Sequence, residues 1–284
     1  MMKRVLTIII VLFGIAGAWL FFTKGGLIKD WILDIQREAS LPPALSYKDA
    51  HQEIIQPASP ELQRGESASP PSGGTNTGEG ASENLGSQNT DIVSPPPKSL
   101  NLDVPFTSQA PFAIWDEVHN EACEEASMMM VAKYKQGVSI NSPEAADQEL
   151  LQIVKFENEQ LGFYKDTTAQ ETLNIARGFY AFKKSRLIYN PSVDDIKNEL
   201  AAGNPVIAPA AGRILPNPYF KSPGPLYHML VIRGYTADGK FITNDPGTRR
   251  GEGFTYTYDS LMNAIHDWNG GDVLNGQRVI IVLD

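Results

Sequence analysis

Four residues spread along this chain have side chains suited to acyl-transfer chemistry: Gln109, Cys123, His228 and Asp245. Cys123 is the single cysteine of the sequence, so it cannot form a disulfide within the chain. It is either a buried, inert side chain or a reactive thiol. A thiolate attacks carbonyl carbon, an imidazole transfers protons, and a carboxylate holds the imidazole in one tautomer. The Gln109 amide could donate a hydrogen bond to a developing oxyanion.

Cys123 stands in the first turn of a helix that the sequence predicts over residues 121–136, with Asn120 as its N-cap. Amide groups at a helix N-terminus favour negative charge, so a thiol there ionises more easily. Glu124 and Glu125 oppose this effect, and a thiolate would then need a positive partner, most naturally an imidazolium. The alternative is a core cysteine, because other apolar residues lie at helical spacing around it: Ala122, Ala126, Met129, Met130 and Tyr134.

His228 and Asp245 occupy the ends of two neighbouring predicted strands. His228 begins the apolar run in PLYHMLVIRGY, and Asp245 ends the next run, KFITNDPG, after a turn signal at residues 237–239. An antiparallel hairpin would bring these two strand ends together, so the carboxylate could bind the second ring nitrogen. Taken singly, His228 could equally be a hydrogen-bonded core residue and Asp245 an ordinary turn residue.

The elements that must position these residues change in type along the chain. Helices are expected to start at Ser142-Pro143, at Thr167 or Thr168, and at Ser192, where Asp195 completes a capping box. Strands are expected at residues 205–208, 227–235, 240–243 and 278–283. Helices first and strands later predict an α+β domain with an antiparallel sheet.

The motifs VPFTSQ, ACEEASMMMV, YHMLVIRGY and NDPG, in this order, resemble those of papain-like cysteine peptidases of the bacteriocin-leader-processing (double-glycine peptidase) type, and more closely their stand-alone bacterial relatives. The resemblance implies a papain-like fold, with the nucleophile-bearing helix packed on an antiparallel sheet. It also implies that Gln109 is the oxyanion donor, Cys123 the nucleophile, His228 the base and Asp245 the orienting acid, with no cofactor. Many relatives have Gly-Pro after the cysteine, where this chain has Glu124 and Glu125.

Substrate contacts are expected around the same residues. The irregular loop of residues 209–225 leads directly into His228, and Tyr219 within it is predicted to contact substrate. Arg213, Phe220 and Lys221 of the loop are further candidates. Glu124 and Tyr227, which adjoin Cys123 and His228, are also predicted to contact substrate. The alternative is a surface loop with no special role.

The remaining histidines are weaker candidates. His119 lies four residues before Cys123, His266 lies in a predicted helix, and His51 belongs to the N-terminal region away from the domain. Four scattered histidines and one cysteine supply no ligand pair at short spacing, so we expect no metal. The 24 Lys plus Arg against 33 Asp plus Glu disfavour nucleic acid as a partner.

The N-terminal third predicts a membrane anchor and a tether. Residues 5–22 carry no charge and follow Lys3 and Arg4, as expected for a single span with its N-terminus in the cytoplasm. The alternative is a cleaved signal peptide, with residues 16–18 as the cleavage site. We predict a signal anchor over residues 1–25, a juxtamembrane segment over 26–56, a disordered linker over 57–99 and the peptidase domain over 100–284, outside the cytoplasmic membrane.

The predicted function is therefore a membrane-anchored thiol hydrolase that cleaves a peptide or protein substrate through a thioester intermediate. Two other classes stay open on the sequence. One is a non-catalytic, membrane-tethered binding module of the same fold. The other is a cell-wall peptide amidase or an acyl transferase, which would use the same nucleophile.

Overall fold

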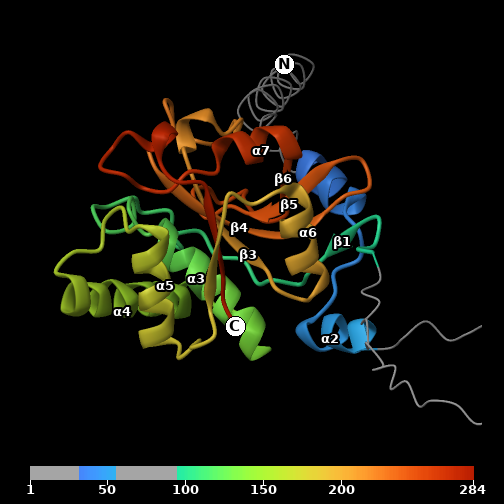
Figure 1. Ribbon diagram of the computed structural model, residues 1–284. Coiled ribbons are helices and arrows are strands. Elements are labelled where there is room, and N and C mark those ends of the chain that lie inside the picture. Colours follow the sequence, from blue (N-terminus) through green and yellow to red (C-terminus); the bar gives the residue numbers. More distant parts are fainter. Residues whose placement is uncertain (1–31, 56–94) are drawn as a thin grey trace, which may run out of the picture.

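An antiparallel sheet forms the centre of the computed structural model, which describes residues 32–55 and 95–284 (Figure 1). Six strands follow one another in the order β2-β7-β3-β4-β5-β6, and β1 pairs with β4. The strands are β1 Leu100–Asn101, β2 Arg186–Tyr189, β3 Val206–Ala210, β4 His228–Tyr235, β5 Lys240–Asn244, β6 Phe254–Thr257 and β7 Val279–Val282. The predicted α+β class with an antiparallel sheet is confirmed.

The helices lie around this sheet, and α3 packs directly against β4 and β3. Figure 1 shows α3, α4 and α5 grouped together on one side of the sheet. The helices are α2 Tyr47–Ile55, α3 Cys123–Gln136, α4 Pro143–Leu161, α5 Ala169–Phe179, α6 Val193–Ala201 and α7 Tyr258–Ala264. Short 3₁₀ turns cover Gly212–Ile214 and Val273–Asn275.

Side-chain caps explain where three of the helices begin. Ser142 accepts a hydrogen bond from the Ala145 amide at the start of α4. Thr168 and Ser192 each form a complete capping box, which satisfies two amides of the first turn of α5 and α6. These predicted helix starts are confirmed.

Helix α3 begins two residues later than predicted. Its N-cap is Ala122, which has no capping side chain, and Cys123 is its first residue. Asn120 is not the N-cap, because its side-chain amide donates to the carbonyls of Trp115 and Asp116 instead. The predicted end is confirmed, since Gly137 adopts the left-handed conformation that closes the helix.

Helix α3 is buried on nearly all its sides. Its three consecutive methionines, Met128 to Met130, have no exposed surface. A helix that buries all its faces belongs to the interior of a domain. As a result, Glu124 and Glu125 in its first turn are also buried.

The described part of the N-terminal region packs on the domain. Residues 32–40 are helical, and the Leu45 amide donates to the Asn101 carbonyl at 2.8 Å. His51 was expected away from the domain, but it lies against Gly203, where an added Cβ would come within 2.8 Å of its ring. Residues 1–31 and 56–94, which include the predicted span and most of the predicted linker, are outside the described residues. Across 32–55 and 95–284, none of the helices has the length and apolarity that a bilayer crossing requires.

Candidate active site

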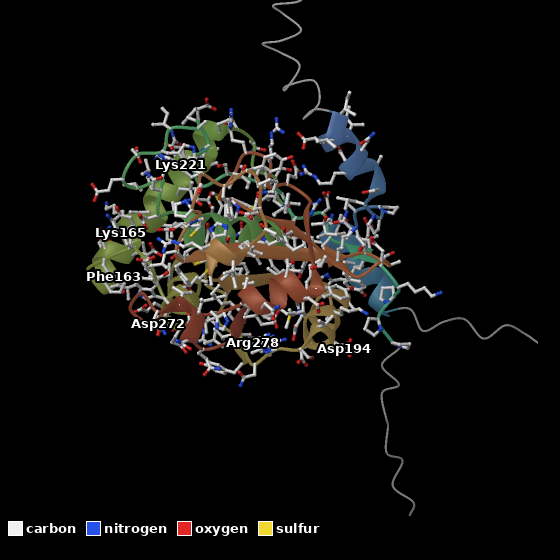
Figure 2. The ribbon with its side chains drawn as sticks, turned by 90° about the horizontal axis from the view of Figure 1, so that it is seen from above. Phe163, Lys165, Asp194, Lys221, Asp272 and Arg278 are labelled. Atoms are coloured by element: carbon white, nitrogen blue, oxygen red, sulfur yellow. The ribbon has the colours of Figure 1, made fainter. Side chains whose placement is uncertain are left out.

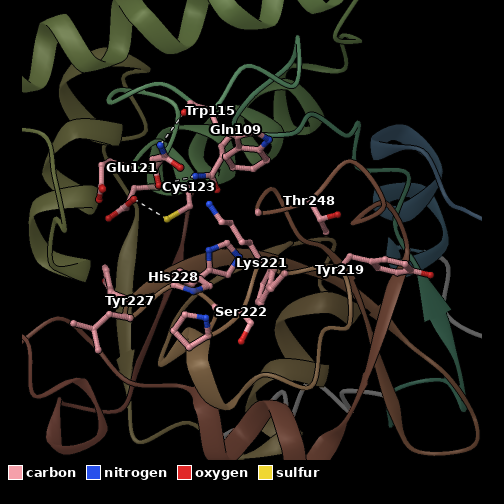
Figure 3. A pocket seen from close by; sticks show the side chains of 18 of the residues that line it. Gln109, Trp115, Glu121, Cys123, Tyr219, Lys221, Ser222, Tyr227, His228 and Thr248 are labelled. Carbon is pink, nitrogen blue, oxygen red and sulfur yellow. Dashed lines mark hydrogen bonds between the residues drawn. The ribbon is translucent and has the colours of Figure 1, made fainter.

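A pocket of about 1440 Å³ lies where α3 begins and β4 begins (Figure 3). Six of the seven predicted site residues line it: Gln109, Cys123, Glu124, Tyr219, Tyr227 and His228. Asp245, the seventh, lies behind His228. The structure therefore brings together residues that are more than one hundred positions apart in the chain.

The closest charged contact of the site joins His228 to Asp245. His228 Nε2 lies 2.7 Å from Asp245 Oδ1, and both side chains are almost completely buried. The pairing of β4 with β5 produces this contact, as the sequence predicted, because antiparallel neighbours bring one strand's start to the other's end. Since Asp245 binds Nε2, the ring nitrogen left for proton exchange with a substrate or a thiol is Nδ1.

Asp245 has further partners on its other oxygen. The Tyr256 hydroxyl and the Asn217 side-chain amide donate to Oδ2 at 2.7 and 3.0 Å, and the Gly247 amide donates to Oδ1 at 3.0 Å. Burial alone would raise the pKa of the Asp245 carboxyl, but the charge of His228 and these hydrogen bonds outweigh it and lower the pKa. The group is therefore an ionised carboxylate.

Sequence reasoning missed Asn217 and Tyr256. Tyr256 lies on β6, a strand that the sequence did not predict, and Asn217 lies in the loop between β3 and β4. An Asn between two prolines carries no signal for this role. The docking of β6 beside β5 brings Tyr256 to Asp245, and the loop between β3 and β4 brings Asn217.

The Cys123 thiol is bound to its neighbour Glu124. Sγ donates to Glu124 Oε2 at 2.9 Å, the dashed line at the sulfur in Figure 3. Burial, followed by the charge of Glu124, raises the pKa of the thiol well above its ordinary value. The expected effect of the helix N-terminus is thus outweighed, and the resting thiol is protonated.

Gln109 lies beside the thiol, but its donors are engaged. Nε2 donates to the carbonyls of His119 and Asn120 at 2.9 and 3.1 Å, which accounts for both of its hydrogens. To donate to an oxyanion it would have to exchange one of these partners. Its Oε1 is buried and finds no hydrogen-bond partner among the described residues. The first-turn amides of α3, including that of Cys123, are the other donors at this place.

Two histidines outside the site have structural partners. His119 lies between Asp116 and Asp147, with ring nitrogen to oxygen distances of 2.7 and 2.8 Å. Both of its nitrogens are thereby occupied, so it ties the loop before α3 to α4. His266 was expected within a helix, but α7 ends at Ala264, and its Nδ1 bonds to the Gly276 carbonyl at 3.0 Å.

The loop before β4 forms one side of the pocket. Phe220 packs edge-on against the His228 ring with centroids 5.3 Å apart, and Tyr219 lies beneath the Arg250 guanidinium at 5.0 Å. The Tyr227 hydroxyl donates away from the pocket, to Thr167 and Asp267. Of the loop residues expected to meet substrate, Tyr219, Phe220 and Lys221 line the pocket and Arg213 does not.

No group of three or more potential metal ligands occurs within residues 32–55 and 95–284. The chemistry of the pocket is that of a thiol, an imidazole and carboxylates.

A family model described as the Peptidase_C39 like family matches residues 101–270, which is more than half of the chain. No curated protein matches the chain. The match includes all seven predicted site residues.

Several solved structures are similar at low identity. A candidate C39-like peptidase from Bacillus anthracis is 15% identical with a TM-score of 0.43, and the alignment covers 64% of this chain and 95% of that one. A prointerpain A fragment from Prevotella intermedia is 15% identical with a TM-score of 0.33, covering 49% of this chain and 41% of that one. Active interpain A cysteine protease from the same organism is 20% identical with a TM-score of 0.31, covering 49% and 56%.

Proposed function

The chain belongs to the Peptidase_C39-like family and is a cysteine peptidase, and from this premise we propose that Cys123, His228 and Asp245 form its catalytic triad. The observation that carries the proposal is the 2.7 Å contact between His228 and Asp245 at the wall of the pocket that Cys123 lines. A buried carboxylate on one ring nitrogen fixes the imidazole tautomer and stabilises its protonated form.

The reaction begins when the thiol leaves Glu124 and turns to His228. Nδ1 takes the proton, and the thiolate attacks the carbonyl carbon of the scissile bond. The tetrahedral intermediate collapses to a thioester between Cys123 and the acyl part, while the imidazolium protonates the departing amine. Water, deprotonated by the same imidazole, then hydrolyses the thioester and returns the thiol.

Oxyanion stabilisation is assigned to the Cys123 backbone amide and to Gln109. The amide lies in the first turn of α3, where the helix dipole also favours negative charge. Gln109 contributes when it exchanges the Asn120 carbonyl, its longer partner at 3.1 Å, for the oxyanion.

The proposal is tested by trapping the acyl-enzyme. The full-length protein is mixed with a peptide p-nitrophenyl ester, quenched in acid and measured by intact mass spectrometry. A single acyl adduct that maps to Cys123, absent from Cys123→Ala and not hydrolysed in His228→Ala, supports the triad. No adduct on Cys123, or normal turnover in His228→Ala, would sink it. Addition of a free amine distinguishes hydrolysis from acyl transfer by the product formed.

We also propose that the catalytic domain acts outside the cytoplasmic membrane, with residues 5–22 as the anchor. The support is the uncharged run after Lys3 and Arg4. Protease accessibility of the domain in intact cells and in spheroplasts, with carbonate extraction of membranes, tests this. Recovery in the soluble cytoplasmic fraction would contradict it.

A further inference from the structure

The pocket beside Cys123 carries opposite charges on its two sides. Figure 3 shows Glu121 on one side of the Cys123 sulfur and Lys221 on the other. The carboxylates come from α3 and from the loops before α3 and α5, and they are Glu117, Glu121, Glu124 and Asp166. The cations come from the loops before β4 and after β5, and they are Lys221, Arg249 and Arg250.

The acidic side has more carboxyl groups than close cations. Glu117 is paired with Lys165 at 2.8 Å. Within the described part of the chain, no ion pair joins Glu121, Glu124 or Asp166 to a cation, although the charge of Lys165 also acts on Glu121 and Asp166. Burial, followed by the charge of Glu125, raises the pKa of Glu124 well above its ordinary value, so this carboxyl gains most from a bound cation. Burial, followed by the charge of Asp166, raises the pKa of Glu121, so these carboxylates oppose one another's ionisation.

A second observation points to a ligand rich in hydrogen-bond donors. Gln109 Oε1 is buried, lacks a partner among the described residues and belongs to a side chain that lines the same pocket. A buried acceptor without a donor is energetically unfavourable. Gln109 Oε1 and the three carboxylates are all acceptors, so the complementary group is a cation with several N–H donors.

Glu124 places this acidic side next to the reacting atom. Its Oε2 is 2.9 Å from Cys123 Sγ, and the residue is only 1% exposed. A substrate group within reach of Glu124 is therefore adjacent to the bond that the thiol attacks.

We propose that Glu121, Glu124 and Asp166, with the Gln109 carbonyl, form a subsite for an ammonium or guanidinium group of the substrate. The inference rests on the proposed function for the identity of the bond, and it names the substrate class: peptides with a lysine, an arginine or a free amino group beside the scissile bond. The opposite side, with Lys221 and Arg249, suits an acidic or carboxylate-bearing part of the same peptide.

Occupation of the subsite also acts on the nucleophile. A cation bound to Glu124 competes with the thiol for Oε2 and so releases the S–H to His228. Glu124 is thereby a specificity-determining residue that couples substrate binding to the position of the thiol.

The experiment uses the single cysteine as its own reporter, so it requires no peptide hydrolysis. Full-length protein is labelled at about pH 8.5, near the pKa of a free thiol, with methanethiosulfonates that carry an aminoethyl, a methyl or a sulfonatoethyl group. Each labelling rate of Cys123 is divided by the rate at which the same reagent labels glutathione. We expect the aminoethyl reagent to be favoured over the methyl reagent by at least about threefold, as a single partly desolvated charge a few ångströms away can produce.

Charge variants test whether the labelling preference comes from the subsite or from the overall charge of the protein. Glu124→Gln and the half-buried Glu121→Gln are each expected to reduce the preference, so the result does not depend on one variant folding. Lys221→Met removes a cation that repels the aminoethyl reagent, so this variant is expected to raise the preference. Asp194→Asn removes one charge from the other side of the molecule (Figure 2) and leaves the preference unchanged.

Two results would overturn the subsite: a wild-type preference of one or below, or the same preference in both glutamate variants. A retained preference in a protein that never forms an acyl-enzyme would contradict the proposed function and keep the subsite. If lysine and norleucine peptides were hydrolysed at equal rates and the labelling preference were absent, the proposed function would be kept and the subsite contradicted.

Discussion

His228 Nε2 and Asp245 Oδ1 are 2.7 Å apart in a buried setting, and a single hairpin between β4 and β5 places them there. Water screens this contact only weakly, so the charge on Asp245 acts more strongly on the imidazole than it would at the surface. The state of the Asp245 carboxyl therefore controls how readily His228 can accept a proton from Cys123.

Tyr256→Phe tests how that carboxylate is maintained. The Tyr256 hydroxyl helps lower the pKa of Asp245, so its removal raises that pKa. A lowered folded-state pKa contributes stability above the unfolded pKa, and this stability is lost as pH falls through the folded value. In the variant the loss starts at a higher pH, and stability at neutral pH falls by about 1 kcal/mol.

Urea unfolding as a function of pH measures both effects, with Tyr189→Phe as the control because Tyr189 is exposed on β2. If Tyr256→Phe unfolded in acid at the same pH as wild type, the assigned role of the hydroxyl would be contradicted.

Glu124→Gln is expected to make the thiol easier to ionise. Burial is the first cause of the raised pKa of Cys123 and stays in place, but the charge of Glu124 is the second and is removed. The pH profile of iodoacetamide labelling should therefore move to lower pH. Asp194→Asn serves as the control. A profile that stays fixed or moves upward would show that Glu124 does not act on the thiol.

Glu125 and Glu157 form a buried carboxyl pair between α3 and α4. Burial raises both pKa values, that of Glu157 to about 8. None of their four oxygens has a donor among the described residues unless one of the two groups is protonated. A raised folded-state pKa gives stability that is complete below the unfolded value of about 4.3 and declines as pH rises toward the folded value.

Glu157→Gln removes the second charge and supplies a donor. We expect the variant to be more stable than wild type at pH 8, by about 1 kcal/mol or more, and to show a smaller decline with pH, because the buried Glu125 remains. Thermal unfolding at several pH values measures this, with the exposed Glu159→Gln of the same helix as the control. A variant that is less stable at pH 8 would refute the shared-proton arrangement.

Gln109→Ala separates an oxyanion donor from a structural residue. Loss of a donor to the transition state lowers kcat on the order of 10²-fold with little change in KM. Loss of the bonds to His119 and Asn120 alone would instead lower the melting temperature and leave kcat nearly constant. Kinetics and melting of the same preparation decide between the two.

Much of the fold was predictable because its signals are local. Ser142, Thr168 and Ser192 start helices through bonds that span only three residues. The same holds for Gly137, where the left-handed backbone ends α3. The hairpin that joins His228 to Asp245 was also predictable, since its turn and both strands are contiguous in the sequence.

The rest of the site depends on contacts between distant segments. Tyr256 reaches Asp245 only because β6 pairs with β5, and Glu125 meets Glu157 only because α4 packs on α3. The start of α3 was misplaced because Asn120 bonds back into its own loop. Such competition between a cap and a loop is decided by the loop's conformation, which no local pattern shows.

The central claim is that His228 activates Cys123, and the pH dependence of Cys123 alkylation in the full-length protein tests it most directly. Iodoacetamide labelling is compared between wild type and His228→Ala by mass spectrometry. Below the free-thiol pKa of about 8.5, the account predicts labelling that persists in wild type, where the thiol can turn from Glu124 to His228 and give up its proton, and that disappears in the variant. Equal profiles in the two proteins, both titrating as a simple buried thiol, would contradict it.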